Sequence, residues 1–120
     1  MGYVIHTDVK FGPLEKVDAG KIAGACAEKW WNQSLLRVND CVVRLGVFEG
    51  EFHWHKHDRE DEIFYVLEGQ LFVDIEGRDP VVLDARQAVM VPRGVVHRTR
   101  APKRTVVLMI EAASIVPTGD

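Results

Sequence analysis

The five histidines of this 120-residue chain are unevenly placed. Three of them, His53, His55 and His57, lie at alternating positions, and Glu62 opens the apolar run that follows. Successive side chains of an extended strand point to opposite faces, so the three imidazoles are predicted to share one face. A hairpin through residues 58–61 can bring Glu62 opposite them. Because imidazole and carboxylate are common ligands of divalent metals, the stretch fits either a metal site or a solvated, pH-sensitive sheet face.

A fourth histidine, His97, lies in a second strand–turn–strand context, after the Pro-x-Gly turn Pro92–Gly94. Other catalytic arrangements are missing from the sequence. Neither of its two serines lies in a nucleophile elbow, and no glycine-rich phosphate loop occurs. The histidines and Glu62 are therefore the candidate functional residues of the chain.

The first segment resembles the first motif of the cupin superfamily, a His-x-His pair followed by a glutamate and a closing glycine. The match places the histidine pair at His55 and His57, the glutamate at Glu62 and the glycine at Gly69. The alternative pair, His53 and His55, would need a closing glycine at position 67, which is leucine. The resemblance therefore selects His55 and His57 as the histidine pair of the motif.

The second segment resembles the second cupin motif, with its turn at Pro92 and Gly94 and its histidine at His97. The sequence departs from that motif at two turn positions. Arg86 stands in place of the opening glycine, and Ala101 stands in place of the closing asparagine.

The resemblance covers about residues 41–112 and implies the double-stranded β-helix, or jelly roll, of the cupins. It also implies four ligands for one divalent metal ion per chain: His55, His57, Glu62 and His97. Three nitrogens and one oxygen suit an ion that accepts six donors, such as Fe, Mn, Ni or Co, and Zn also fits. The remaining positions can take a small, anionic or enolisable molecule. His53 could be a hydrogen-bond partner of this site, a general base, or an ordinary packed or solvated side chain.

Two classes of function follow from the resemblance. Small cupins include metal-dependent dioxygenases, isomerases, cyclases and lyases that act on small molecules. A cupin can also be a non-catalytic binding or sensing protein with a structural metal. The complete ligand set favours an enzyme, although the fold is shared by many chemistries.

The elements that must position these residues are predicted to be short strands separated by turn pairs. Their close spacing predicts an all-β sandwich or barrel. Before residue 33, Ile22, Cys26 and Trp30 recur at helical spacing after Asp18, which predicts a short capped helix. We therefore expect an N-terminal extension (residues 1–32) packed on a barrel (residues 33–120). The predicted strands are Ser34–Val38, Cys41–Phe48, Glu51–His57, Glu62–Leu67, Gln70–Ile75, Pro80–Leu83, Ala88–Val91, Val95–Arg100 and Thr105–Ala112.

The composition excludes several classes of partner. With 15 basic and 18 acidic residues, a net charge of -3 gives no general attraction to nucleic acid or anionic membranes. No apolar run approaches the roughly 20 residues of a membrane helix. The first residues lack the pattern of a signal peptide, so a cytoplasmic, reducing setting is expected.

Cys26 and Cys41 are isolated in the sequence. Cys41 shares parity with Leu45 and Val47 and is therefore predicted to be a buried thiol.

Two aromatic side chains beside the histidines bear on how the protein assembles. Phe52 and Trp54 alternate with the histidines and are therefore predicted to point away from the metal face. Exposed aromatic side chains on a sheet are often buried between chains. We therefore expect a homodimer.

Overall fold

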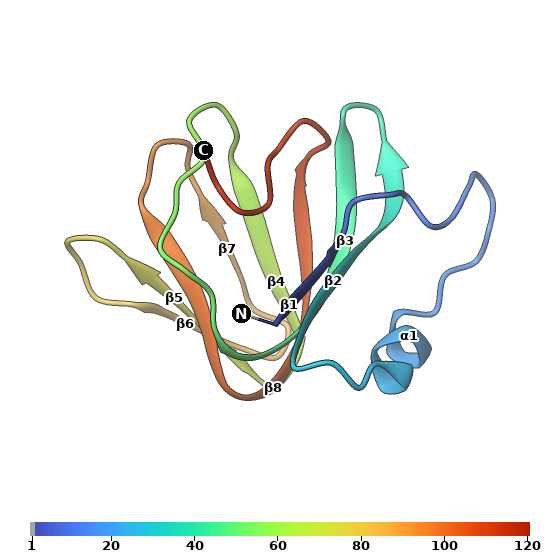
Figure 1. The fold of residues 1–120 in the computed structure, drawn as a ribbon, viewed down its shortest axis with the longest axis horizontal. Helices are drawn as coiled ribbons and strands as arrows, with labels where there is room; N and C mark the ends of the chain where they lie inside the picture. Colours follow the sequence, from blue (N-terminus) through green and yellow to red (C-terminus); the bar gives the residue numbers. More distant parts are fainter. Residues whose placement is uncertain (1) are drawn as a thin grey trace.

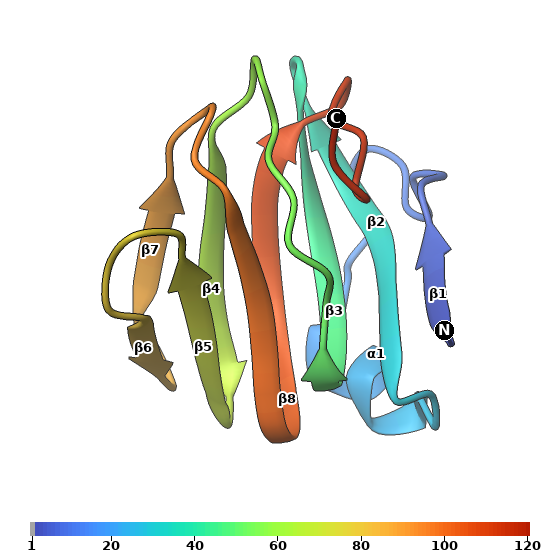
Figure 2. The same cartoon turned by 60° about the vertical axis from the view of Figure 1, so that its left-hand side comes forward.

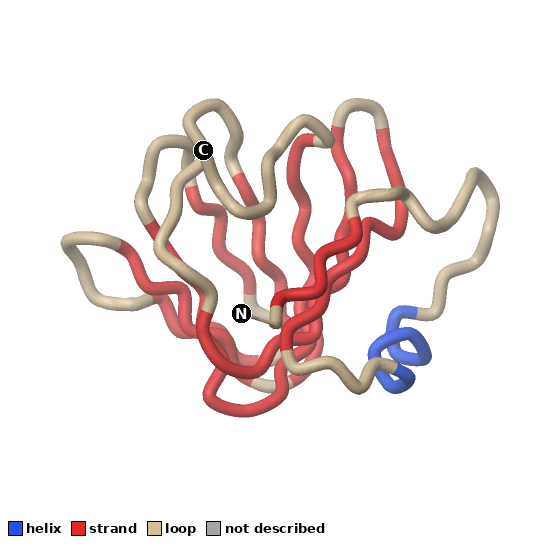
Figure 3. The backbone as a smooth tube through the Cα atoms, viewed as in Figure 1, coloured by secondary structure: helices blue, strands red, loops and turns tan. Residues whose placement is uncertain are grey.

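The structure, a computed structural model, describes residues 2–120, and strands dominate it (Figure 1, Figure 3). Its single helix within these residues is too short to cross a membrane. The elements in chain order are β1 (Tyr3–His6), α1 (Ala19–Ala25), β2 (Trp30–Val38), β3 (Cys41–Glu51), β4 (Glu62–Glu68), β5 (Gln70–Ile75), β6 (Val81–Asp84), β7 (Ala88–Val91) and β8 (His97–Ala112).

The strands pair in the order β1-β2-β3-β8-β4-β7, and β5 pairs with both β8 and β6. The long strand β8 bends, as Figure 1 shows, so that its first part pairs with β5 and its second part pairs with β3 and β4. The two arms of β8 therefore belong to opposite walls of one barrel (Figure 2). The predicted all-β jelly roll is confirmed.

The interior of the barrel is filled by alternate side chains of each strand. On β4 the buried positions are Glu62, Phe64 and Val66, whereas Ile63 and Tyr65 between them are half-buried and face outward. A strand alternates its faces with a period of two residues. The pattern that buries the apolar residues of β4 therefore also carries the Glu62 carboxylate into the interior.

A second apolar cluster covers the outer face of β2, β3 and β8. It joins Leu35, Leu45, Val47 and Val106 to Ala23 of α1. The helix begins where the sequence predicts, because the Asp18 side chain accepts a hydrogen bond of 3.0 Å from the backbone N–H of the third residue after it. The helix ends before Cys26, so Trp30 is not part of its stripe.

The N-terminal segment also contributes a strand that the sequence analysis did not predict. Strand β1 pairs in parallel with β2, with Tyr3 opposite Trp30 and His6 opposite Gln33. The proposed division near residue 33 therefore falls inside β2. Residues on both sides of it share one sheet.

Three other expectations are wrong. The segment Glu51–His57 is not a strand, because β3 ends at Glu51 and only His55 forms an isolated bridge beyond it. The two strands predicted over residues 95–112 are one bent strand, because Ala101 continues the pairing with β3 opposite Gly50. Cys41, predicted to be a buried thiol, is half-buried at the start of β3; both cysteines are free.

Arg86, which replaces a motif glycine, adopts the backbone conformation that the glycine would provide. Its φ is 68°, in the left-handed region, and its side chain is exposed. A side chain in this region costs about 1 kcal/mol relative to glycine. We therefore expect Arg86→Gly to raise the free energy of unfolding by up to about 1 kcal/mol, measured by urea denaturation. Arg78→Gly, another exposed arginine, should not stabilise the protein; an equal gain there would contradict the explanation.

Candidate metal centre

The structure brings together the four residues that the motifs single out. His55 and His57 lie in the connection between β3 and β4, Glu62 is the first residue of β4, and His97 is the first residue of β8. One nitrogen or oxygen of each side chain lies within 4.8 Å of the corresponding atom of the others. The four therefore form a group that could bind a metal ion.

The backbone holds these residues in place. His55 and His97 face each other in a β-bridge, with two N–H···O bonds of 2.9 Å. The Gly94 N–H donates to the carbonyl of His57 at 2.8 Å, and Gly94 has a φ of 80°. The Pro-x-Gly turn of the second motif thus ties the two histidine segments together.

The ring nitrogens are arranged as metal ligands would be. The Nδ1–H groups of His55 and His97 donate to the carbonyls of His53 and Val95, each at 2.9 Å. A neutral imidazole that donates from Nδ1 presents a lone pair at Nε2. The backbone of this chain therefore selects the tautomer in which Nε2 can bind an ion.

Several atoms of the group are buried without a hydrogen-bond partner in residues 2–120, namely both ring nitrogens of His57, Nε2 of His97 and Oε1 of Glu62. Glu62 Oε1 lies 3.4 Å from His57 Nε2 and 3.5 Å from His97 Nε2. Each unsatisfied buried polar atom costs about 1–3 kcal/mol. A divalent ion between these atoms would satisfy three of them at once, so the residues fit the metal that the motifs imply.

Burial and charge shift the ionisation of the site. Burial lowers the pKa of His55 to about 4, and the neighbouring imidazoles add to this effect. Burial acts to raise the pKa of Glu62, but the neighbouring imidazoles of His57 and His97 outweigh it and hold that pKa well below its ordinary value. Neutral imidazoles beside an ionised carboxylate are the protonation states that bind a metal.

The shifted pKa of His55 predicts a pH dependence of stability in the metal-free protein. Between about pH 6.5 and pH 4 the unfolded chain binds a proton at His55 that the folded chain does not. The free energy of unfolding should therefore fall as the pH falls through this window. Urea denaturation at several pH values should show a smaller fall in His55→Gln than in the native protein. Equal falls in the two proteins would contradict the prediction.

His53 does not join the four. Its ring is exposed, and Nε2–H donates to the Thr118 carbonyl at 2.7 Å. Phe52, predicted to face away from the site, instead lies inside: it is buried, and its ring centroid lies 5.2 Å from that of His55. The alternation fails because the chain leaves the sheet after Glu51, so strand parity no longer applies.

The C-terminal segment, residues 113–120, crosses the mouth of the barrel (Figure 1). The Asp120 N–H donates to the Lys56 carbonyl at 2.9 Å, and the Asp58 N–H donates to the Asp120 carboxylate at 2.7 Å. At Gly119, whose φ is 97°, a Cβ would lie 2.6 Å from the Cβ of His55. This segment therefore packs directly on the connection that carries two of the histidines.

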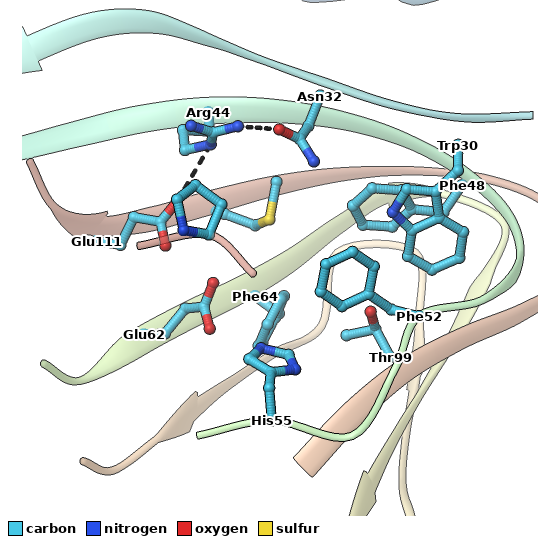
Figure 4. Close-up of a pocket in the computed structure, with 12 residues that line it drawn as sticks. Trp30, Asn32, Arg44, Phe48, Phe52, His55, Glu62, Phe64, Thr99 and Glu111 are labelled. Carbon is cyan, nitrogen blue, oxygen red and sulfur yellow. Dashed lines mark hydrogen bonds and ion pairs between the residues drawn. The ribbon is translucent and has the colours of Figure 1, made fainter. Parts of the chain in front are cut away.

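A cavity of about 30 Å³, enough for one or two water molecules, is lined by two of the four residues, His55 and Glu62. Its apolar walls include Trp30, Phe48, Phe52 and Phe64, and the rings of Trp30 and Phe48 stack at 4.2 Å. Figure 4 shows His55 and Glu62 at one side of this cavity. A larger ligand would require side chains to move.

The polar residues at the other side of the cavity were not predicted from the sequence. Arg44 of β3 pairs with Glu111 of β8 at 3.2 Å, and Asn32 of β2 accepts a hydrogen bond from Arg44 (Figure 4). Burial and the charge of Glu62 raise the pKa of Glu111 well above its ordinary value. The available signal was a charged residue inside each of two apolar runs, residues 41–48 and 106–112.

Comparisons with known proteins agree with this geometry. The family model described as "Cupin domain" matches residues 41–112. The chain is 48% identical over 90 residues to the uncharacterized protein YdbB of Bacillus subtilis (strain 168), over 75% of this chain and 80% of that protein. The crystal structure of a cupin-2 domain containing protein from Shewanella frigidimarina NCIMB 400 is similar with a TM-score of 0.75 and 28% identity, over 80% of this chain and 93% of that one. Protein NMB1881 from Neisseria meningitidis is similar in fold, with a TM-score of 0.74 and 23% identity, over 82% of this chain and 99% of that one. The chain therefore belongs to the cupin family.

Proposed function

We propose that the protein is a metal-dependent enzyme that acts on a small molecule bound through an oxygen atom. One observation carries the proposal: three imidazoles and one carboxylate converge, and two of the four, His55 and Glu62, line a cavity with both apolar and polar sides. Four protein ligands leave positions open on an ion that accepts six. A bound divalent ion of this kind supplies Lewis acidity to an oxygen of the ligand. The donor set suits Fe, Mn, Ni, Co or Zn, so the proposal does not depend on one metal.

In this proposal the side chains around the cavity have separate roles. His55, His57 and His97 would hold the ion through ring nitrogens, and Glu62 would hold it through an oxygen. His53 contributes its backbone carbonyl, which orients His55. The aromatic walls and Pro117 of the C-terminal segment exclude water from the bound molecule.

Among the cupin chemistries, an isomerase or lyase reaction fits the cavity best. Glu111 lines the cavity, and burial together with the charge of Glu62 raises the pKa of its carboxyl group well above the ordinary value. Its Oε2 is buried without a partner in the described residues. A carboxyl group that holds a proton beside the bound molecule can donate and reaccept it, as isomerisation and elimination require.

The experiment is reconstitution with Co(II) or Fe(II) under anaerobic conditions, followed by titration with small oxygen donors. An open site predicts that the Co(II) spectrum shifts with small acids or ketones and that the Fe(II) protein binds nitric oxide. A complete, structural coordination sphere would respond to neither. The absence of any spectral change would therefore replace the enzyme proposal with a binding or sensing protein that holds a structural metal.

We also propose that the protein forms a homodimer, on a surface other than the one the sequence suggested. Since Phe52 lies inside, only Trp54 remains of the predicted aromatic pair. The outer face of the sheet instead carries an apolar row across four strands, because Ile63 pairs with both Met90 and Ile110, and Ile110 also pairs with Val43. Met90 is 49% exposed and Ile110 37%. A second copy of the chain would cover this row.

We expect Ile110→Lys to convert the dimer to a monomer in sedimentation equilibrium, because a charge at the centre of an apolar contact is left unpaired. Val82→Lys is the matched control, since Val82 is similarly exposed (45%) but lies on β6. A native protein that sediments at 13.6 kDa at high micromolar concentration would refute the dimer.

A further inference from the structure

The side of the cavity opposite His55 holds an amide whose orientation is fixed. Asn32 lies on β2, is buried, and lines the cavity. Its Oδ1 accepts a hydrogen bond from a terminal nitrogen of Arg44. A guanidinium has donors only, so the oxygen of the amide must face Arg44 and the NH₂ group must point away from it. Figure 4 shows this nitrogen directed toward the cavity.

Arg44 is itself held so firmly that it cannot adapt to a different orientation of Asn32. It pairs with Glu111 at 3.2 Å and donates to the Ser34 hydroxyl at 3.2 Å. Its side chain is only 3% exposed. The orientation of the Asn32 amide is therefore imposed by the protein and does not depend on the ligand.

An amide donor that faces a largely apolar cavity favours a ligand with a matching acceptor, because an unpaired buried donor costs about 1–3 kcal/mol. A site built to pair a polar group rejects analogues that lack it. We propose that Asn32 is a specificity-determining residue that donates a hydrogen bond to a second oxygen acceptor of the ligand. The site then selects small molecules that carry a carboxylate or carbonyl group in addition to the oxygen that binds the metal. This inference rests on the proposed function.

The test compares acids of equal chain length on the Co(II)-loaded protein. Malonate and propionate form one pair, succinate and butyrate the other, and affinities are read from the Co(II) spectrum. In the native protein at least one diacid should bind more tightly than its matched monoacid. Asn32→Leu, which keeps the size but removes the donor, should reduce this ratio about fivefold to tenfold. A chelating effect of the second carboxylate on the metal would survive the substitution, so the change in the ratio isolates the amide.

Two further variants sharpen the test. Asn32→Asp keeps an acceptor for Arg44 and nearly the same shape but removes the donor, so it should lose the preference even if Asn32→Leu folds poorly. Ser34→Ala removes a different partner of Arg44 and should keep the preference. Co(II) uptake should be unchanged in all three. An unchanged ratio in Asn32→Asp, with normal Co(II) uptake, would overturn the role of Asn32. A native protein that takes up no Co(II) would instead contradict the proposed function, and this inference with it.

Discussion

The His97→Ala variant is expected to bind Co(II) more than about 100-fold more weakly than the native protein. Changes to groups that merely support a metal ligand cost 10–100-fold in affinity, and the loss of a ligand should cost more. The buried Oε1 of Glu62 would also lose a neighbour at 3.5 Å. Competition with a chelator gives the affinity, and elemental analysis of the purified protein gives the occupancy.

His6→Ala is the matched control, because His6 is exposed on β1 and lies outside the group of four. It should leave both affinity and occupancy unchanged. His57→Ala should behave as His97→Ala does. Full occupancy in both variants would show that the ion is held elsewhere and would remove the basis of the proposed function.

The second large effect is expected from Arg44→Leu, which should lower the free energy of unfolding by about 3 kcal/mol or more. The side chains of Arg44 and Glu111 are 3% and 2% exposed. Breaking a buried ion pair by removing one partner leaves an uncompensated polar group, which costs about 3–5 kcal/mol. Asn32 and Ser34 would lose their donor as well. Urea denaturation of the metal-free protein measures the difference.

Lys29→Leu provides the control, since Lys29 pairs with Glu49 at 2.9 Å but its side chain is 77% exposed. Such surface pairs contribute about 0–1 kcal/mol. Arg44→Leu combined with Glu111→Leu should recover part of the stability, because Glu111 then no longer remains buried without its partner. If the double variant were less stable than Arg44→Leu alone, the pair would not be the source of the loss.

The candidate ligands were predictable from the sequence because local geometry places them. The Pro-x-Gly turn positions His97, and the parity of β4 buries Glu62 with Phe64. The resemblance to the cupin motifs then selected His55 and His57 over His53. A fixed spacing in the chain was sufficient where a turn or a strand sets the direction of the side chain.

The rest of the cavity could not be predicted, because it depends on contacts between distant strands. Asn32, Arg44 and Glu111 come from β2, β3 and β8, and only the pairing of these strands brings them together. The orientation of Phe52 was predicted wrongly because the chain leaves the sheet at Glu51, and no sequence feature near Glu51 indicates this. The bend of β8 was missed because Ala101 and Pro102 are equally compatible with a turn.

The position of the C-terminal segment has a practical consequence for handling the protein. Since Asp120 is hydrogen-bonded to the backbone at Lys56 and Asp58, a peptide joined after Asp120 would begin at the mouth of the barrel. A polyhistidine tag attached there would present additional imidazoles next to the candidate ligands and could scavenge the ion or donate to it. The N-terminal end offers no remote alternative, because the ring of Tyr3 lies 4.6 Å from that of Phe52, which lines the cavity. Metal analysis therefore calls for a tag without histidine, or for removal of the tag before the measurement.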